Sequence, residues 1–246
     1  MLRNSLIASL VLSLIVPLFS CQASEISAVE FLSVNLPSIV AVSSKVPVIK
    51  GVPATPGKRV NPLLFLAKHR RVMEVDRKGA GIIIAPSGLI ATNAHIVRKA
   101  TDITVTLSTG ETLPAKLVTA SSSHDLAIVK IDPPRDLRAV EFGDSEKIRL
   151  GDKAYTVGSS LILKDTMYQG KIIGIGNFDN KSLGAATRVD LIKTNLELLK
   201  GDSGAPLFDA AGKCLGLLYA SATGRARYTF AVPSSVILQD SEGADK

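Results

Sequence analysis

Hydrophobic residues along this chain occur in short runs that are separated by polar turns, such as Pro86-Ser87-Gly88 and Ser108-Thr109-Gly110. In the first half, the runs predict strands at 38–43, 72–75, 80–84, 89–92, 103–107, 113–118 and 126–131. In the second half, they predict strands at 154–157, 166–174, 191–194, 205–208, 214–219 and 228–232. Because no strand alternates with a long helical pattern, a parallel α/β sheet is excluded and an all-β fold of two antiparallel barrels is predicted.

The intervening segments predict how these strands are divided. The proline-rich break at 132–136 marks the crossing between barrels, which are expected at about 38–132 and 145–235. Four prolines predict a long loop at 46–62, and short helices are expected at 61–71 and 95–99. Outside the barrels, residues 21–37 are expected to form a tether with some helical potential, and residues 236–246 a polar tail.

The first 20 residues have the layout of a secretory signal peptide. One basic residue, Arg3, precedes an apolar core at 6–19 that is too short to span a membrane stably. The sequence Leu18-Phe19-Ser20-Cys21 resembles a bacterial lipobox, in which Cys21 is lipidated, and Gln22 then favours the outer membrane. Cleavage after Ala23 would instead release a soluble exported protein. Both alternatives stay open, and both predict export to the bacterial cell envelope.

Composition narrows the classes of function. The cations behind the formal net charge of +7 are spread along the chain rather than grouped with aromatic residues, so nucleic-acid binding is not expected. A basic surface near anionic lipid is an alternative use of that charge. The three histidines lack paired cysteines, so neither a metal site nor a cofactor is predicted. Cys214 lies in an apolar run and is expected to be a buried thiol with no disulfide partner.

The candidate chemistry centres on the turn Gly201-Asp202-Ser203-Gly204-Ala205-Pro206, which places one serine between glycines. A serine hydroxyl is a weak nucleophile unless a base takes its proton and hydrogen-bond donors stabilise the anion formed on the substrate. Glycine permits positive φ, so the amides around Asp202, those of Gly201 and Ser203, can converge as an oxyanion hole. Ser203 is therefore the predicted nucleophile.

Three histidines are available as its base: His69, His95 and His124. His95 follows an apolar run, where a strand would deliver it to a rim, and Asp125 opens the next apolar strand as the predicted orienting carboxylate. His124 is expected to face solvent, because neighbours on a strand point to opposite faces. His69 lies among basic residues in a predicted loop. The predicted triad is thus His95, Asp125 and Ser203.

Four segments, in this order, resemble motifs of the trypsin-like serine peptidases, and most closely of the HtrA/Deg branch. They are Thr92-Asn93-Ala94-His95-Ile96-Val97, Asp125-Leu126-Ala127-Ile128-Val129-Lys130-Ile131, Phe142-Gly143-Asp144-Ser145 and Phe230-Ala231-Val232-Pro233-Ser234. The resemblance covers about residues 38 to 235. It implies two antiparallel six-stranded β-barrels of the chymotrypsin type, with the active site in the cleft between them.

Two departures from that branch stand in the nucleophile turn, where Asp202 and Ala205 replace an asparagine and a second glycine. Alanine is tolerated wherever φ is negative, but a requirement for positive φ at Ala205 would strain the oxyanion hole. Relatives in this branch also carry one or two PDZ domains after the peptidase unit. Only a short tail follows here, so a protease domain without a PDZ domain is expected.

Glu197 lies six residues before Ser203, the offset at which trypsin-like enzymes place the base of the primary specificity pocket. A buried acid there would select lysine or arginine in the substrate. The alternative is a loop glutamate that faces solvent or pairs with Lys200.

The predicted function is that of a serine endopeptidase that cleaves exported, unfolded or damaged polypeptides through an acyl-enzyme intermediate. The resemblance also allows a homo-oligomer and, through Cys21, attachment to a membrane. The alternative from another class is a catalytically silent barrel protein that binds polypeptides in the envelope. An esterase would share the machinery but usually needs the helices of an α/β-hydrolase, which this chain lacks.

Overall fold

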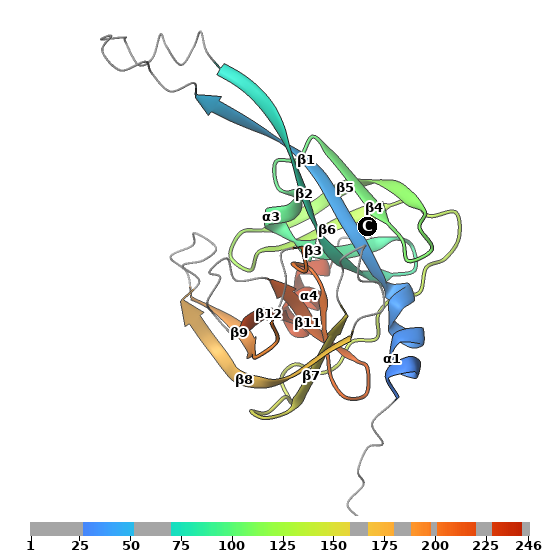
Figure 1. Cartoon of the computed structure of the whole chain (residues 1–246), viewed down its shortest axis with the longest axis vertical. Helices are drawn as coiled ribbons and strands as arrows, with labels where there is room; N and C mark the ends of the chain where they lie inside the picture. Colours follow the sequence, from blue (N-terminus) through green and yellow to red (C-terminus); the bar gives the residue numbers. More distant parts are fainter. Residues whose placement is uncertain are drawn as a thin grey trace, which may run out of the picture.

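The computed structural model describes residues 27–51, 70–157, 167–179, 188–197, 201–219 and 228–242. These residues form two closed barrels, in the strand orders β1-β2-β3-β6-β5-β4 and β10-β11-β12-β9-β8-β7 (Figure 1). The first barrel comprises β1 (Ile39–Gly51), β2 (Arg70–Ala85), β3 (Leu89–Asn93), β4 (Asp102–Thr106), β5 (Thr112–Ser121) and β6 (Leu126–Ile131). The second comprises β7 (Lys153–Val157), β8 (Met167–Asp179), β9 (Arg188–Thr194), β10 (Pro206–Phe208), β11 (Cys214–Tyr219) and β12 (Thr229–Pro233). The predicted all-β fold of two six-stranded antiparallel barrels is confirmed.

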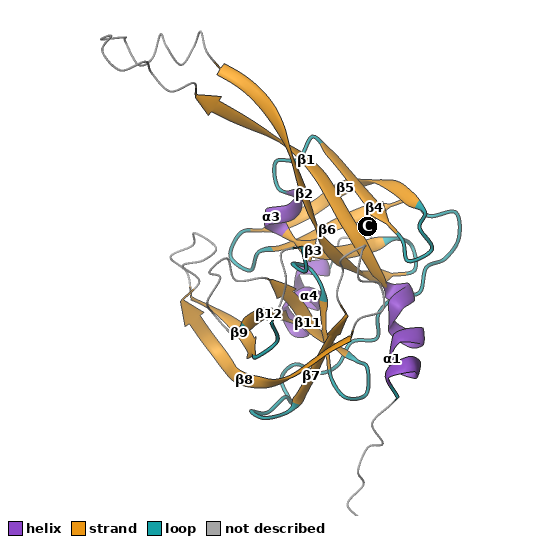
Figure 2. Cartoon of the chain, in the orientation of Figure 1, coloured by secondary structure: helices purple, strands orange, loops and turns teal. Residues whose placement is uncertain are grey.

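Helices in the described part of the chain are short and lie outside the barrels (Figure 2). They are α1 (Ala28–Asn35), the 3-10 turn η1 (Leu36–Ser38), α3 (Ala94–Val97) and α4 (Ser234–Ser241). None of these helices is long and apolar enough to cross a membrane. The predicted signal peptide at 1–20 and Cys21 lie outside the described residues.

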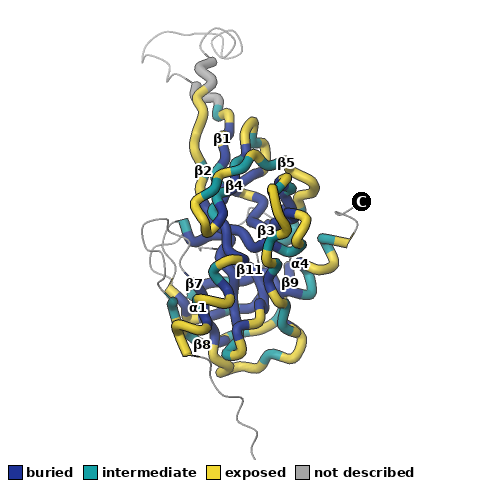
Figure 3. The backbone as a smooth tube through the Cα atoms, turned by 90° about the vertical axis from the view of Figure 1, so that its right-hand side faces the viewer, coloured by how far each residue is buried: buried dark blue, intermediate teal, exposed yellow. Residues whose placement is uncertain are grey.

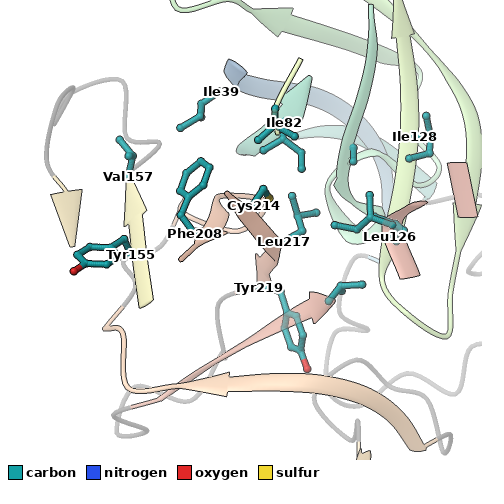
Figure 4. Close-up of a cluster of buried hydrophobic side chains, with 14 of the residues drawn as sticks. Ile39, Ile82, Leu126, Ile128, Tyr155, Val157, Phe208, Cys214, Leu217 and Tyr219 are labelled. Carbon is teal, nitrogen blue, oxygen red and sulfur yellow. The ribbon is translucent and has the colours of Figure 1, made fainter. Parts of the chain in front are cut away.

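Aliphatic side chains fill each barrel and also the space between the barrels. Val42, Ile90 and Val129 lie inside the first barrel, and Ile192 and Leu218 lie inside the second. A third cluster joins the two barrels and contains Ile39, Ile82, Leu126, Ile128, Phe208, Leu217 and Tyr219, all of which are buried (Figure 4). The burial pattern in Figure 3 follows the same division, with buried backbone along the barrel interiors. The two barrels are therefore packed into one body, with the candidate site residues at their junction.

The first two strands are longer than predicted. The expected loop at 46–62 begins as strand, because β1 continues to Gly51 and pairs with β2 throughout. The predicted strands at 72–75 and 80–84 are parts of the single strand β2. Of the predicted helix at 61–71, the last two residues belong to β2 and the rest lie outside the described residues. The four prolines predicted a loop from residue 46 onward, which is wrong for 46–51, because Pro47 lies within β1 with Glu74 as its Cα partner.

Both predicted flanking segments contain helices that pack on the barrels. In the expected tether, α1 begins at its N-cap Ser27, whose hydroxyl accepts a hydrogen bond from the amide of Glu30. Phe31, on this helix, is only 3% exposed, and its ring lies 5.2 Å from Phe208 and 5.7 Å from Tyr155. In the expected polar tail, α4 buries Ile237 completely. The sequence analysis missed both contacts, because each helix places few apolar residues on the domain.

Replacing Phe31 with alanine tests whether α1 is part of the folded domain. We expect Phe31→Ala to lower the free energy of unfolding by about 3–5 kcal/mol, because it leaves a cavity against two aromatic rings. Chemical denaturation measures this loss. The control is Val29→Ala on the same helix, where the side chain is 79% exposed and the change should stay within about 0.5 kcal/mol. Similar values for the two variants would show that α1 is not docked in solution.

Cys214 gives the fold a dependence on alkaline pH. Burial raises the pKa of its thiol to about 12, whereas a free thiol has a pKa of about 8.5. Above about pH 9 the unfolded chain loses this proton before the folded chain does, so rising pH favours unfolding by about 1.4 kcal/mol per pH unit. Denaturation at several pH values should therefore show a steeper alkaline loss of stability in the wild type than in Cys214→Ala. Parallel pH curves for the two proteins would contradict the assignment.

Candidate active site

His95 and Asp125 come from adjacent strand ends of the first barrel and contact each other directly. His95 lies in α3 immediately after β3, and Asp125 immediately precedes β6, which pairs with β3. The His95 Nδ1 atom lies 2.6 Å from Asp125 Oδ2, and the His95 amide donates to Asp125 Oδ1 at 2.8 Å. The carboxylate side chain is 7% exposed, whereas the imidazole side chain is 45% exposed. Asp125 can therefore orient the ring, and the rest of the ring remains accessible.

The backbone of Asp125 adopts an uncommon conformation that the surrounding residues hold in place. Its φ is +52°, in the left-handed region that a non-glycine residue seldom occupies. Its carbonyl oxygen accepts hydrogen bonds from the Ala94 amide at 2.9 Å and from Asn93 Nδ2 at 3.2 Å. Asn93 and Ala94 directly precede His95. The histidine and the aspartate are thus connected through both their side chains and their backbones.

Ser203 lies in a tight turn that leads into β10. The carbonyl oxygen of Asp202 accepts a hydrogen bond from the Ala205 amide at 3.0 Å, which makes Ser203 the second residue of a four-residue turn. Gly204, the third residue, has φ of +88°, as a type II turn requires. Gly201 also has a positive φ, of +109°. The glycines therefore provide the backbone freedom expected at both positions.

The substitution of alanine for glycine at position 205 does not strain this turn. Lys99 and Asp125 are the described non-glycine residues with positive φ, so Ala205 is outside that region. Its methyl group is fully buried in the core of the second barrel. Asp202, the other departure, is 2% exposed and directly precedes Ser203. The turn accommodates both residues.

The turn that contains Ser203 is docked on β2 of the other barrel. The carbonyl oxygen of Ser203 accepts a hydrogen bond from the Ala80 amide at 2.7 Å. A Cβ atom added to Gly204 would lie 2.0 Å from the Ala80 carbonyl oxygen, so no other residue fits there without a backbone shift. A Cβ atom added to Gly79 would lie 2.6 Å from the Ser203 carbonyl oxygen and 2.3 Å from Ile96 Cδ1. Gly79 therefore lies against both the serine turn and Ile96, the residue that follows His95.

Three further residues lie close to these groups. The Thr92 hydroxyl donates to the Ala80 carbonyl oxygen at 2.6 Å, and an Arg77 Nη1 atom donates to the carbonyl oxygen of His95. Tyr219 on β11 is 2% exposed and its pKa is raised, first by burial and then by the negative charge of Asp125 (Figure 4). Thr92 belongs to the motif that contains His95, whereas Arg77 and Tyr219 lie in none of the quoted motifs, because only the fold brings them to the site.

The remaining candidate residues lie apart from this arrangement. His124 Nδ1 lies 3.5 Å from Asp240 Oδ2 on α4, so His124 contacts the C-terminal helix rather than His95. The expectation that it faces solvent is wrong in this respect, since its side chain is only 30% exposed. Glu197 is exposed in the segment after β9, and its role in specificity stays a prediction. His69 and Lys200 lie outside the described residues, which contain no cluster of His, Cys, Asp and Glu that could hold a metal ion.

Comparisons with known proteins agree with this geometry. A family model described as a trypsin-like peptidase domain matches residues 79–217. A probable periplasmic serine endoprotease, DegP-like, from Brucella suis biovar 1 (strain 1330) is 35% identical over 166 residues, which are 66% of this chain and 32% of that protein. Its counterpart from Pseudomonas savastanoi pv. phaseolicola (strain 1448A / Race 6) is 33% identical over 174 residues, 70% of this chain and 35% of that protein. The chain thus spans about a third of the length of these curated relatives.

Similar solved structures are described as HtrA-type proteases. A variant of the HtrA-type protease AlgW with a decapeptide has a TM-score of 0.73 and 26% sequence identity, covering 90% of this chain and 68% of that chain. AlgW with a tripeptide has a TM-score of 0.68 and 26% identity, covering 87% and 62% respectively. This chain therefore belongs to the trypsin-like peptidases and contains a protease domain of the HtrA/Deg type.

Proposed function

We propose that this protein is a serine endopeptidase in which His95, Asp125 and Ser203 form the catalytic triad. The observation that carries the proposal is the 2.6 Å contact between His95 Nδ1 and Asp125 Oδ2, opposite a serine turn docked on the same barrel. A buried carboxylate on Nδ1 leaves Nε2 of the neutral ring as the atom that accepts a proton. His95 can then act as a general base.

In the proposed reaction, the Ser203 oxygen bonds to the carbonyl carbon of the scissile peptide while His95 takes the hydroxyl proton. His95 then delivers this proton to the leaving amine, the carbon–nitrogen bond breaks, and an acyl-enzyme remains. Water, deprotonated by His95, then attacks the ester carbonyl, and His95 returns that proton to the Ser203 oxygen as the bond between this oxygen and the acyl carbon breaks and the second product is released. Asp125 keeps the ring in the required tautomer and stabilises its charged form.

We assign to the turn at 201–203 the stabilisation of the anion that forms on the substrate carbonyl oxygen. Gly201, with φ of +109°, and the tight turn around Ser203 support convergence of the Gly201 and Ser203 amides, with Asp202 between them. Backbone donors held rigidly in this way stabilise an oxyanion without reorganisation during the reaction. The docking of Ser203 and Gly204 on Ala80 supplies that rigidity.

We also propose where the enzyme acts and on what. Its curated relatives are named periplasmic endoproteases, and its structural neighbours include complexes with a tripeptide and a decapeptide. These names support exported polypeptides as substrates, with unfolded or damaged chains as the preferred class. Residues 1–20 would direct export, and either lipidation of Cys21 or cleavage after Ala23 would complete it. A homo-oligomer is compatible with this proposal.

The triad is tested with the exported protein and the variants Ser203→Ala, His95→Ala and Asp125→Asn. We expect all three to lose cleavage of an unfolded protein, with Asp125→Asn lowering kcat by roughly ten-thousandfold because the wrong imidazole tautomer results. A fluorophosphonate probe should label the wild type and should not label Ser203→Ala.

His124→Gln is the matched control, because this histidine lies beside Asp125 but contacts α4. It should retain both cleavage and labelling. Intact substrate and no labelling in a folded wild type would contradict the peptidase proposal and favour a protein that only binds polypeptides.

Glu197 is tested by the cleavage profile rather than by the rate alone. If Glu197 forms the base of the primary pocket, Glu197→Ala should lose any preference for lysine or arginine before the scissile bond, because charge pairing is removed. Mass spectrometry of the peptides cut from a mixed library measures this preference. Identical profiles for the wild type and the variant would leave Glu197 as a solvent-facing residue.

A further inference from the structure

The helix that carries His95 is too short to be stable by itself. α3 is a single turn, Ala94–Val97, and the Arg98 amide donates to the carbonyl oxygen of Ala94 at 2.8 Å. The C-terminal carbonyl groups of a helix have no partner within the helix. In a helix of this length they include the carbonyl groups of His95 and Ile96. Both need hydrogen-bond donors from elsewhere in the fold.

Two side chains of the first barrel supply these donors. An Arg77 Nη1 atom on β2 donates to the carbonyl oxygen of His95, and the Ser44 hydroxyl on β1 donates to that of Ile96 at 2.5 Å. Ser44 and Arg77 are Cα partners in the β1–β2 ladder, so their side chains leave the sheet on the same face. This cross-strand pair binds two consecutive carbonyl groups of α3, which packs on both strands (Figure 1). The pair is called the carbonyl clamp below.

The clamp belongs to a well-supported part of β1. Ser44 has Arg77 on β2 and Ile103 on β4 as Cα partners, so β1 is paired on both sides at this point. The Ser44 side chain is buried. After α3 the chain returns to the next residue of β1, where the Thr101 amide donates to the carbonyl oxygen of Lys45 at 2.8 Å. Both α3 and the turn that follows it are therefore attached to β1.

The clamp completes the support of the His95 backbone. Before His95, the Ala94 amide donates to the carbonyl oxygen of Asp125, and the His95 amide donates to Asp125 Oδ1. After it, the carbonyl oxygen of His95 accepts from Arg77. The imidazole side chain is 45% exposed, so close packing does not fix it as it would fix a core side chain. Its position therefore depends on how its backbone is held.

The same strand also binds the proposed nucleophile. The Ala80 amide donates to the carbonyl oxygen of Ser203 at 2.7 Å, and Ala80 follows Arg77 by three residues on β2. Because a strand rises about 3.3 Å per residue, roughly 10 Å of extended backbone separates the two contacts. β2 therefore relates the backbone of the proposed base to that of the proposed nucleophile.

We propose that Ser44 and Arg77 are positioning residues for the peptidase reaction and act through His95. The clamp holds the carbonyl groups of α3 so that Nε2 of His95 is directed at Ser203, and neither clamp residue has to touch the substrate. Displacement of a reacting group by about 1 Å can lower a rate about a hundredfold. A charged donor such as Arg77 makes a stronger bond than a neutral one, which suits its partly exposed position. The inference rests on the proposed function.

Steady-state cleavage of a peptide by the full exported protein tests the clamp. Arg77→Met keeps the aliphatic stem but has no donor. We expect it to lower kcat about ten- to a hundredfold with KM within about twofold, because the base is displaced while the substrate still binds. Arg77→Lys retains a donor and should recover most of this loss. Ser44→Ala should behave like Arg77→Met, and circular dichroism checks that each variant is folded.

Arg98→Met is the matched control, because it removes a neighbouring guanidinium from the same helix. Arg98 directly follows α3, but its Nη1 atom donates to the Ser122 hydroxyl oxygen at 2.7 Å rather than to a helix carbonyl group. This variant should keep the wild-type kcat. Unchanged kcat in Arg77→Met and Ser44→Ala, an equal loss in Arg98→Met, or no recovery in Arg77→Lys would overturn the proposal.

A second measurement separates the clamp from the peptidase proposal. In nitrogen NMR spectra of isotope-labelled histidine rings, wild-type His95 should show the tautomer with its proton on Nδ1, since that atom contacts Asp125. We expect both tautomers in Arg77→Met and the wild-type spectrum in Arg98→Met. A wild type that neither cleaves the peptide nor reacts with the fluorophosphonate contradicts the peptidase proposal alone. Identical ring spectra for the wild type and Arg77→Met would overturn the clamp.

Discussion

The contact on which this structure depends is the docking of the serine turn on β2. One hydrogen bond joins the Ala80 amide to the Ser203 carbonyl oxygen at 2.7 Å, and Gly204 lies against the Ala80 backbone where no side chain fits. Ser203 belongs to the second barrel, whereas His95 and Asp125 belong to the first. This contact therefore fixes the proposed nucleophile relative to the strand that packs beside the proposed base, which the non-directional apolar layer between the barrels cannot do by itself.

One strand, β2, contacts both parts of this site. In chain order along β2, Arg77 donates to the carbonyl oxygen of His95, Gly79 lies between Ile96 and the serine turn, and the Ala80 amide donates to the carbonyl oxygen of Ser203. β2 therefore contacts the proposed base and the proposed nucleophile, although these two residues belong to different barrels.

Much of this arrangement could be predicted from local sequence. The alternation of short apolar runs and turns indicated two antiparallel barrels, and glycines around Ser203 indicated a turn with positive φ, which Gly201 and Gly204 have. The elements that were missed, α1 and α4, have weak local signals. They are stabilised by single buried residues, Phe31 and Ile237, whose partners are distant in the sequence. The extension of β1 to Gly51 was also missed, because the prolines at 46–62 predicted a loop where β1 continues to pair with β2.

The sequence by itself determined the fold class and the residue types of the candidate site. These properties depend on periodicity, local turn chemistry and composition, which each segment carries on its own. Tertiary structure alone decided that His95 contacts Asp125, that His124 instead contacts Asp240, and that the serine turn rests on Ala80. Those contacts join residues that are far apart in the chain, so they arise only when the two barrels close and pack together.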